Sequence, residues 1–538
     1  IKYGGFNNAV MELSTFSIIL IAIFLITYSI LNLVVFKKKL PPGPICFPLI
    51  GCSYIVKKYS IKYGGFNNAV MELCKLYKTD ILGLNLGGSY MVIVQGDKLL
   101  KEALLKDELL GRPKNFFLYL RSLCTNKGIT MTDGHLWQEQ RTFAMKHLHN
   151  LGFGKEPMEN LMQEEIQKFI NTVQKNGLKS GIKPAVSRCV LNVLWTLVAG
   201  IKIDTEDVDE FLTLMYKRSK AFDMSGGLIS QFPWIRFIAP EASGYNLIKQ
   251  LNNKLRYIIR RAIEEHKATY RKDRTRDYID AFLHEMYGTQ HKHTTFTDDQ
   301  LIMVCLDFLI AGSETTSSSI VFLLLHMIRS LDIQQTAYEE ISSILKPGQI
   351  SSLNHKKQMP YIKAVLLENE RLIPVAPTLG PRRVLKDISL GGYTIRKNTT
   401  VLFNILPSSR DENIWKDPTV FSPLRFLKND VQVEKEKLFT FGKGKRRCPG
   451  EKLAKGFIFL FFTSLLNQFK IINSDENSIP PLQYLPGIVL SPLPYEVTLI
   501  PRYTSASEPI SNPSKNEVAP NGNGQIRRIS ALHGKLFE

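Results

Sequence analysis

Residues 441–450 have the sequence FGKGKRRCPG and lead into a long apolar segment that is predicted to form a helix. The three glycines of this stretch allow positive φ angles and let the backbone pass close beneath a flat cofactor. Arg446, Arg447 and the N-terminus of the following helix would favour the thiolate form of Cys448. The stretch therefore predicts a cysteine that serves as a metal ligand. The alternative is a basic surface loop with an incidental buried cysteine.

The spacing Phe-x-x-Gly-x-Arg-x-Cys-x-Gly in this stretch resembles the haem-ligand signature of cytochrome P450 enzymes. Its fixed positions are filled by Phe441, Gly444, Arg446, Cys448 and Gly450. The resemblance implies that Cys448 is the metal ligand and binds the iron of haem b (iron-protoporphyrin IX) through its thiolate. It also implies that the other four residues contact this cofactor.

Further motifs of that family occur in the family's order and extend the resemblance over almost the whole chain. Residues 311–316 (AGSETT) match the oxygen-activation segment of the long central helix, and residues 368–371 (ENER) match the Glu-x-x-Arg pair. Residues 415–418 (WKDP) and 421–426 (FSPLRF) match the meander, although Leu424 stands where a glutamate is frequent. The implied fold is mainly α, the cytochrome P450 haem-thiolate fold, with a long central helix and a smaller β lobe.

Two polar residues, Glu314 and Thr315, lie inside the apolar run of that central helix, where an unpaired carboxylate or hydroxyl costs free energy. By resemblance they are the candidate catalytic residues, which deliver protons to the oxygen that is reduced. Gly312 removes side-chain bulk beside them and would let a diatomic ligand approach. The alternative is a helix kink rich in serine and threonine with a surface glutamate.

A charged pair precedes the meander. Glu368 and Arg371 lie three residues apart on one face of a predicted helix and can form an ion pair. Alone, such a pair is more typical of a solvated helix face. With Arg425 at the matching meander position, the resemblance implies a buried structural network that fixes the cysteine loop.

Haem propionates require cations and hydrogen-bond donors, and further residues match family positions for this purpose. They are Trp137 and Arg141 in a Trp-x-x-x-Arg segment, and Arg382 after Pro381. Together with Arg446 they are the candidate propionate contacts. The alternatives are a core aromatic residue at Trp137 and a solvated loop charge at Arg382.

The 538 residues carry a formal net charge of +20, which predicts an acidic partner or surface. No nucleic-acid-binding motif accompanies this charge, so no nucleic acid is expected, and anionic lipid and an acidic electron donor are favoured. The resemblance implies NADPH-cytochrome P450 reductase, an acidic flavoprotein, and cytochrome b5 as partners. Lys443, Lys445 and Arg447 would steer their docking. The alternative is a merely basic surface.

An uncharged stretch at residues 14–36 predicts a transmembrane anchor, because its 23 residues would span roughly 34 Å as a helix. Three lysines follow, and the positive-inside tendency then keeps the downstream part in the cytosol. Residues 37–50 form a basic, proline-rich hinge, and residues 51–502 are expected to form one catalytic domain. The sequence thus predicts a single-pass membrane protein with its catalytic domain in the cytosol, and the resemblance implies the endoplasmic reticulum membrane. The alternative to the anchor is a cleaved signal peptide.

The two ends of the sequence differ from the rest. Residues 1–13 repeat residues 61–73 identically and place ten residues ahead of Met11, so we interpret them as a duplicated, artefactual segment. Residues 503–538 are rich in Ser, Asn, Pro and Gly and are expected to form a disordered tail.

Hydrophobic patterns along the domain predict mostly helix. Helices are expected at residues 159–173, 186–198, 244–270 and 277–287, a β-hairpin at 81–86 and 90–94, and a second β region at 388–406.

The central helix is expected over residues 301–328, opened by a capping box at residues 297–300. A second transmembrane span is the alternative, but Asp307 and Glu314 disfavour it. The seven cysteines show no paired framework, which favours a reducing, cytosol-facing location.

Together these features predict a haem-dependent monooxygenase that hydroxylates or epoxidises a lipophilic substrate with electrons from NADPH through a separate reductase. Apolar segments that would line the substrate pocket are residues 116–120, 224–228, 308, 376–379 and 488–490. Steroids, sesquiterpenoids, fatty acids and foreign compounds all fit this lining. The alternatives are a haem-thiolate isomerase or dehydratase that needs no reductase, and a non-enzymatic haem sensor.

Overall fold

The computed structural model describes residues 40–503, apart from five internal gaps, and four isolated positions near the N-terminus. The gaps are residues 151–154, 179–180, 289–293, 428–434 and 476–477, and the isolated positions are 17, 20, 23 and 27. The predictions for the duplicated segment, the membrane anchor and the tail beyond residue 503 therefore fall outside the described residues, the isolated positions aside.

Helices make up most of the described chain. The α-helices are α2 (Ser53–Tyr63), α3 (Phe66–Leu76), α4 (Asp97–Leu105), α5 (Phe116–Arg121), α6 (Gly134–Asn150), α7 (Glu156–Asn176), α8 (Ile182–Ala199), α9 (Thr205–Ala221), α10 (Gly227–Gln231), α11 (Ile235–Ile238), α12 (Tyr245–Ala268), α13 (Tyr278–Gly288), α14 (Asp298–Arg329), α15 (Leu331–Ser342), α16 (Pro360–Leu372), α17 (Leu406–Ser409) and α19 (Glu451–Gln468). Short 3-10 helices are η1 (Asp107–Leu109), η2 (Leu353–Lys357), η3 (Pro423–Phe426) and η4 (Gly444–Arg446). The strands are β1 (Ile81–Leu86), β2 (Ser89–Val94), β3 (Thr378–Arg383), β4 (Ile388–Leu390), β5 (Tyr393–Ile395), β6 (Thr400–Asn404), β7 (Phe469–Asn473), β8 (Tyr484–Leu485), β9 (Ser491–Pro492) and β10 (Val497–Pro501).

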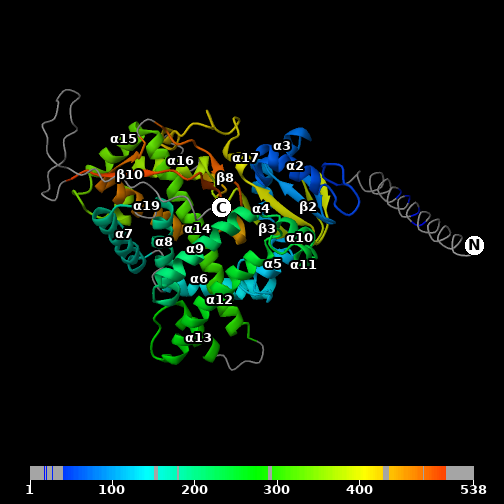
Figure 1. Ribbon diagram of the computed structural model, residues 1–538, viewed down its shortest axis with the longest axis horizontal. Coiled ribbons are helices and arrows are strands. Elements are labelled where there is room, and N and C mark those ends of the chain that lie inside the picture. Colours follow the sequence, from blue (N-terminus) through cyan, green and yellow to red (C-terminus); the bar gives the residue numbers. More distant parts are fainter. Residues whose placement is uncertain are drawn as a thin grey trace, which may run out of the picture.

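The elements divide into a large helical body and a smaller β-rich part. In Figure 1 the strands β2 and β3 and the helices α2 and α3 gather at one side, and α7, α8, α14 and α19 lie in the body. The prediction of a mainly α chain with a smaller β lobe is confirmed. The helices predicted at residues 159–173, 186–198, 244–270 and 277–287 are also confirmed, as α7, α8, α12 and α13, with ends shifted by a few residues.

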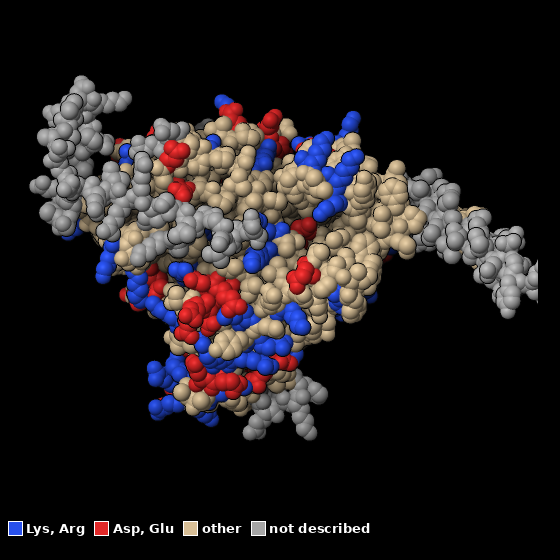
Figure 2. Space-filling view, in the orientation of Figure 1, with Lys and Arg blue, Asp and Glu red and all other residues tan. Residues whose placement is uncertain are grey.

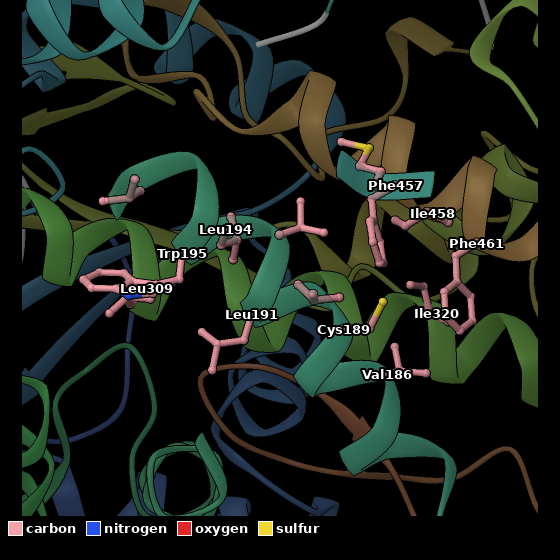
Figure 3. Packing of buried hydrophobic residues seen from close by; sticks show 14 of the residues in the cluster. Val186, Cys189, Leu191, Leu194, Trp195, Leu309, Ile320, Phe457, Ile458 and Phe461 are labelled. Atoms are coloured by element: carbon pink, nitrogen blue, oxygen red, sulfur yellow. The ribbon is translucent and has the colours of Figure 1, made fainter. Parts of the chain in front are cut away.

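The long helix α14 runs through the hydrophobic core. Figure 3 shows side chains of α8, α14 and α19 that meet there, among them Leu191, Trp195, Leu309, Ile320 and Phe457. Both α8 and α14 are apolar and long enough to span a membrane, but most of each is buried inside the protein. Burial by the protein's own helices therefore accounts for their composition, as expected for a core helix.

The start of α14 differs in one detail from the predicted capping box. The Thr297 hydroxyl accepts the Gln300 N–H at 3.3 Å, as a cap does. The Gln300 side chain does not return to the cap. Instead its amide accepts the Gly128 N–H at 3.0 Å and donates to the Gly128 carbonyl at 3.2 Å. A contact distant in sequence thus replaces the reciprocal half of the box.

The main sheet has the strand order β1-β2-β6-β3. The predicted hairpin is confirmed, with Ile81 opposite Val94 in an antiparallel pair. The predicted second β region divides: β4 and β5 form a separate hairpin, and β6 pairs parallel with β2 and antiparallel with β3. Strand β3 was not predicted, and its pairing with β6 positions Arg382 opposite Val401.

Charged residues on α9 and α12 tie these two helices together. Lys254 pairs with Asp207 at 2.7 Å, and Arg261 pairs with Asp204 at 2.9 Å. Figure 2 shows basic and acidic side chains interspersed over this part of the surface. Much of the basic composition is therefore matched locally here.

Candidate active site

Cys448 lies in a tight loop between η4 and α19. Gly442 and Gly444 have φ angles of 67° and 70°, in the left-handed region that favours glycine. The Cys448 N–H donates to the Phe441 carbonyl at 2.8 Å. A Cβ at Gly444 would lie 2.7 Å from the Leu104 carbonyl oxygen. The loop therefore reverses tightly and packs against the end of α4.

Gly450 acts differently from the other two glycines. Its φ angle is −85°, so it does not use the left-handed conformation that we had expected of all three. It is the N-cap residue of α19, and a Cβ there would lie 3.9 Å from the Cys448 Sγ. The missing side chain keeps the space beside the sulfur open.

The Cys448 side chain is exposed, although the loop and its neighbours partly surround the sulfur. Burial raises the pKa of the thiol, the Gly450 N–H lowers it, and the charges of Arg141 and Arg447 lower it further. The Arg446 guanidinium donates to the carbonyls of Leu110 and Thr132. The net upward shift of the pKa means that a bound cation would be needed to hold the thiolate at neutral pH.

The four predicted propionate contacts converge beside this loop. The Arg446 guanidinium carbon lies 3.7 Å from the Trp137 ring centroid, and that of Arg141 lies 5.9 Å from the same centroid. Arg382 and Arg446 donate to the neighbouring carbonyls of residues 109 and 110, at 3.1 and 2.6 Å. Residues from α6, β3 and η4 thus form one cationic cluster.

This cluster has more donors than acceptors. Trp137 Nε1 and Arg446 Nη1 are buried without a hydrogen-bond partner among the described residues. Burial, followed by the charges of Arg112 and Arg382, lowers the pKa of Arg446 to about 8. A guanidinium stays protonated in proteins, so this shift reports a charge that the chain does not compensate. An anion with several oxygen acceptors fits the cluster, as the propionates of haem would.

A small accessible face interrupts the burial of α14. Ala311 is exposed and Thr315 is half-buried in the middle of this helix, although most of its other residues are buried. The two residues are four apart and share one face. The Thr315 hydroxyl donates to the Ala311 carbonyl at 2.9 Å. This face can border a ligand that the helix does not touch elsewhere.

Gly312 is half-buried like Thr315 and lies on the same side of α14, where it also faces α8. A Cβ at Gly312 would come within 2.7 Å of the Leu194 Cδ1 on α8. The glycine therefore permits close packing of α8 on α14.

Glu314 projects toward α8 and α9. Its side chain is 7% exposed, and its Oε1 has no hydrogen-bond partner in the described part of the chain. Burial raises the pKa of Glu314 to about 7, and the charges of Lys183 and Arg218 lower it. Consecutive residues project about 100° apart around a helix, so Glu314 and Thr315 point in different directions. A proton path between them would need intervening groups.

Glu368 and Arg371 on α16 are completely buried and paired. Arg371 Nε and Nη2 donate to the two Glu368 oxygens at 2.7 and 2.9 Å, and Arg425 Nε donates to Glu368 at 3.0 Å. Arg371 Nη1 also donates to the carbonyls of Ser409 and Pro418, at 2.6 and 2.9 Å. The pair therefore ties α16 to the meander. Leu424, at the meander position where a glutamate is frequent in the family, is 62% exposed.

Glu370, which directly precedes Arg371 on α16, connects the network to the cysteine loop. The Thr440 hydroxyl donates to the Glu370 carbonyl at 3.3 Å, one residue before the loop begins. The Glu370 carboxylate pairs with Lys455 of α19 at 3.2 Å. Helix α16 thus contacts the chain on both sides of Cys448.

Of a second buried ion pair, the sequence indicated only the acid, Asp307, and not its partner. Asp307 of α14 pairs with Arg121 of α5 and accepts the N–H groups of Ile129 and Thr130 at 2.6 and 2.8 Å. The same loop reaches the cationic cluster, because Arg446 donates to the Thr132 carbonyl at 2.7 Å. A lone acid in an apolar run is a signal, but its partner lies 186 residues away.

Three of the five segments expected to line a substrate pocket come together, namely residues 116–120, 224–228 and 488–490, whereas Phe308 packs against the main core and Leu379 against the β-lobe cluster. Residues of α5, the segment after α9, α14, α16 and residues 488–490 form one apolar cluster. The Leu490 N–H donates to the Val375 carbonyl at 2.7 Å, so residues 488–490 lie beside the residue that directly precedes the predicted segment 376–379.

Comparison with known proteins agrees with this geometry. The family model described as Cytochrome P450 matches residues 41–499. Probable cytochrome P450 305a1 of Drosophila melanogaster is 37% identical over 90% of this chain and 98% of that protein. Farnesoate epoxidase of Bombyx mori is 33% identical, covering 87% and 95%, and cytochrome P450 2J2 of Homo sapiens is 30% identical, covering 86% and 92%. The chain belongs to the cytochrome P450 family of haem-dependent monooxygenases.

Proposed function

We propose that this protein hydroxylates or epoxidises a lipophilic substrate with dioxygen, using electrons that NADPH supplies through a separate reductase. The observation that carries the proposal is the accessible Cys448 sulfur beside a cluster of uncompensated cations. The apolar cluster around residues 488–490 supports a lipophilic substrate.

Haem bound through Cys448 would supply the activation of dioxygen for insertion of one oxygen atom into a C–H or C=C bond. The chain's own residues would hold it in two ways. Its propionates would be bound by Trp137, Arg141, Arg382 and Arg446. Its ring would be bordered by Phe441, Gly444 and Gly450.

Glu314 and Thr315 would manage protons on the α14 side. Thr315 presents its hydroxyl on the accessible face. Glu314, with a pKa of about 7, can both hold and release a proton near neutral pH. Because no direct hydrogen bond joins them in the described chain, the proton would pass through solvent or substrate.

Basic residues of the cysteine loop would receive an acidic flavoprotein reductase or cytochrome b5. Lys445 pairs with Asp107 at 2.5 Å and Arg447 with Glu451 at 2.7 Å, but both cations remain about 60% exposed. Exposed pairs contribute little stability, so a docking partner can exchange with them. This surface suits electrostatic steering rather than a permanent interface.

The protein would be attached to the endoplasmic reticulum membrane. Leu49, Phe237 and Ile238 expose 81%, 76% and 75% of their surface. Their segments lie together, because the Ser53 hydroxyl donates to the Gln231 side chain at 2.8 Å. Figure 2 shows few charges near the point where the N-terminal trace meets the body. An apolar patch of this kind fits a lipid surface.

Terpenoid acids and esters are candidate substrates, because one relative is named a farnesoate epoxidase. Fatty acids and steroids are the other classes to compare. The apolar lining favours all three over polar compounds.

Reconstitution with a flavoprotein reductase and NADPH tests the function. We expect oxygen uptake in step with oxidised product from at least one sesquiterpenoid, fatty acid or steroid, and none without the reductase. Product that forms without oxygen and reductase would instead indicate an isomerase or dehydratase. Haem binding without any turnover of such a panel would favour a sensor.

Substitution of the two α14 residues tests proton delivery. Thr315→Ala should leave the thiolate-type spectrum intact and divert most reducing equivalents to hydrogen peroxide. Because Glu314 holds its proton below about pH 7, product per NADPH in the wild type should fall as the pH rises through that value. Glu314→Gln should abolish this pH dependence. Normal coupling in Thr315→Ala would remove Thr315 from the reaction.

Substitution of Arg371 tests the buried network. Arg371→Met removes the bidentate partner of the buried Glu368 carboxylate and leaves it only Arg425, and should cost about 3–5 kcal/mol of unfolding free energy with loss of bound haem. The double variant Glu368→Leu/Arg371→Met should recover much of that stability. Lys445→Met, which breaks an exposed pair, is the matched control and should cost less than about 1 kcal/mol. Denaturant titration followed by haem absorbance measures all three, and an Arg371→Met protein as stable as the wild type would contradict the role.

A further inference from the structure

An arginine occupies the buried face of α9. The buried positions of this helix are Val208, Phe211, Leu214, Met215, Arg218 and Ser219. Arg218 is only 7% exposed, and the buried residues that precede it on this helix are all apolar. Buried arginines are rare unless they are paired.

The Arg218 guanidinium has no hydrogen bond and no ion pair with any residue that the structure describes. Burial lowers the pKa of Arg218 to about 10, the charge of Arg121 lowers it further, and the charge of Glu314 raises it. By contrast, the charge of the buried Arg371 is balanced by its ion pair with Glu368. Arg218 lacks such compensation.

The nearby acids are already paired or only partly ionised at neutral pH. Asp307 is engaged by Arg121, by the N–H groups of Ile129 and Thr130, and by the Thr130 hydroxyl at 2.6 Å. The Asp307 charge therefore balances Arg121 and leaves nothing for Arg218. Glu314 lies beyond ion-pair distance of Arg218, and its raised pKa keeps much of it protonated near neutral pH.

A second cation faces the same carboxyl group. Lys183 of α8 donates to the Ser491 hydroxyl at 2.7 Å, and Glu314 raises its pKa against the lowering effect of burial. The region between α8, α9 and α14 thus contains two cations, Lys183 and Arg218, and one acid, Glu314, that is only partly ionised at neutral pH. An additional negative charge would be stabilised there.

Arg218 also lies next to the apolar cluster that would receive the substrate. The neighbouring Ser219 binds the segment 487–490: its hydroxyl donates to the Val489 carbonyl at 3.2 Å, and its carbonyl accepts the Ile488 N–H at 3.3 Å. A Cβ at Gly487 would lie 1.9 Å from the Ser219 carbonyl oxygen, so this approach is close. An acidic group at Arg218 could therefore continue into an apolar chain along residues 488–490.

We propose that Arg218 binds the carboxylate of a lipophilic acid substrate, with Lys183 as a supporting cation. A guanidinium can bind both oxygens of a carboxylate, and the buried setting strengthens the pair. This inference rests on the proposed function and narrows its substrate class to acids, of which farnesoic acid and dodecanoic acid are probes. Neutral esters of the same chains lack the charge and should bind less well.

Binding of acid and ester pairs tests the proposal without turnover. Farnesoic acid and dodecanoic acid, each against its methyl ester, are titrated into the ferric holoprotein and followed by the substrate-induced spectral shift. The wild type should prefer each acid, and Arg218→Leu should weaken acid binding at least about tenfold while ester binding changes less than about twofold. Arg218→Lys should retain part of the preference. Lys217→Leu removes an exposed cation from the same helix and should change neither.

Thermal stability separates a substrate role from a structural one. Removal of a buried, unpartnered charge should leave the melting temperature of Arg218→Leu equal to or above that of the wild type. A clear fall in melting temperature, equal binding of acid and ester by the wild type, or equal weakening of both by Arg218→Leu would overturn the proposal. Acid-selective binding without oxygen-dependent product would instead count against the proposed function and leave the acid site standing.

Discussion

The buried ion pair of Glu368 with Arg371 fixes the geometry on which the rest of the site depends. Two opposite charges with no solvent exposure must satisfy each other and their neighbours, because water cannot. Their hydrogen bonds reach the meander, and Glu370 beside them contacts the chain before and after the cysteine loop. The position of Cys448 is thus set by a network that need not touch the reacting atoms.

Buried cations in this chain fall into two groups. Arg371 and Arg121 are matched by Glu368 and Asp307, and they hold elements of the fold together. The cluster around Arg446 and the isolated Arg218 are not matched by the chain. Because an uncompensated buried charge costs free energy, we expect an anion to bind at these two places. One group fits a cofactor's carboxylates, and Arg218 fits that of a substrate.

The sequence was informative where function restricts local residues, and less so where distant segments meet. The cysteine motif, the β-hairpin and the long central helix were all readable from short stretches. The contact of Gly312 with α8 and the role of Gln300 were not, because they depend on Leu194 of another helix and on Gly128. Arg218 was not among the residues that the sequence indicated, and only its burial distinguishes it.

The most direct test of the account is iron X-ray absorption on the purified holoprotein and on its Cys448→Ala variant. The account predicts one sulfur atom in the wild-type iron coordination shell and none in the variant. A wild-type shell that contains only nitrogen and oxygen, or a sulfur that persists in the variant, would contradict it.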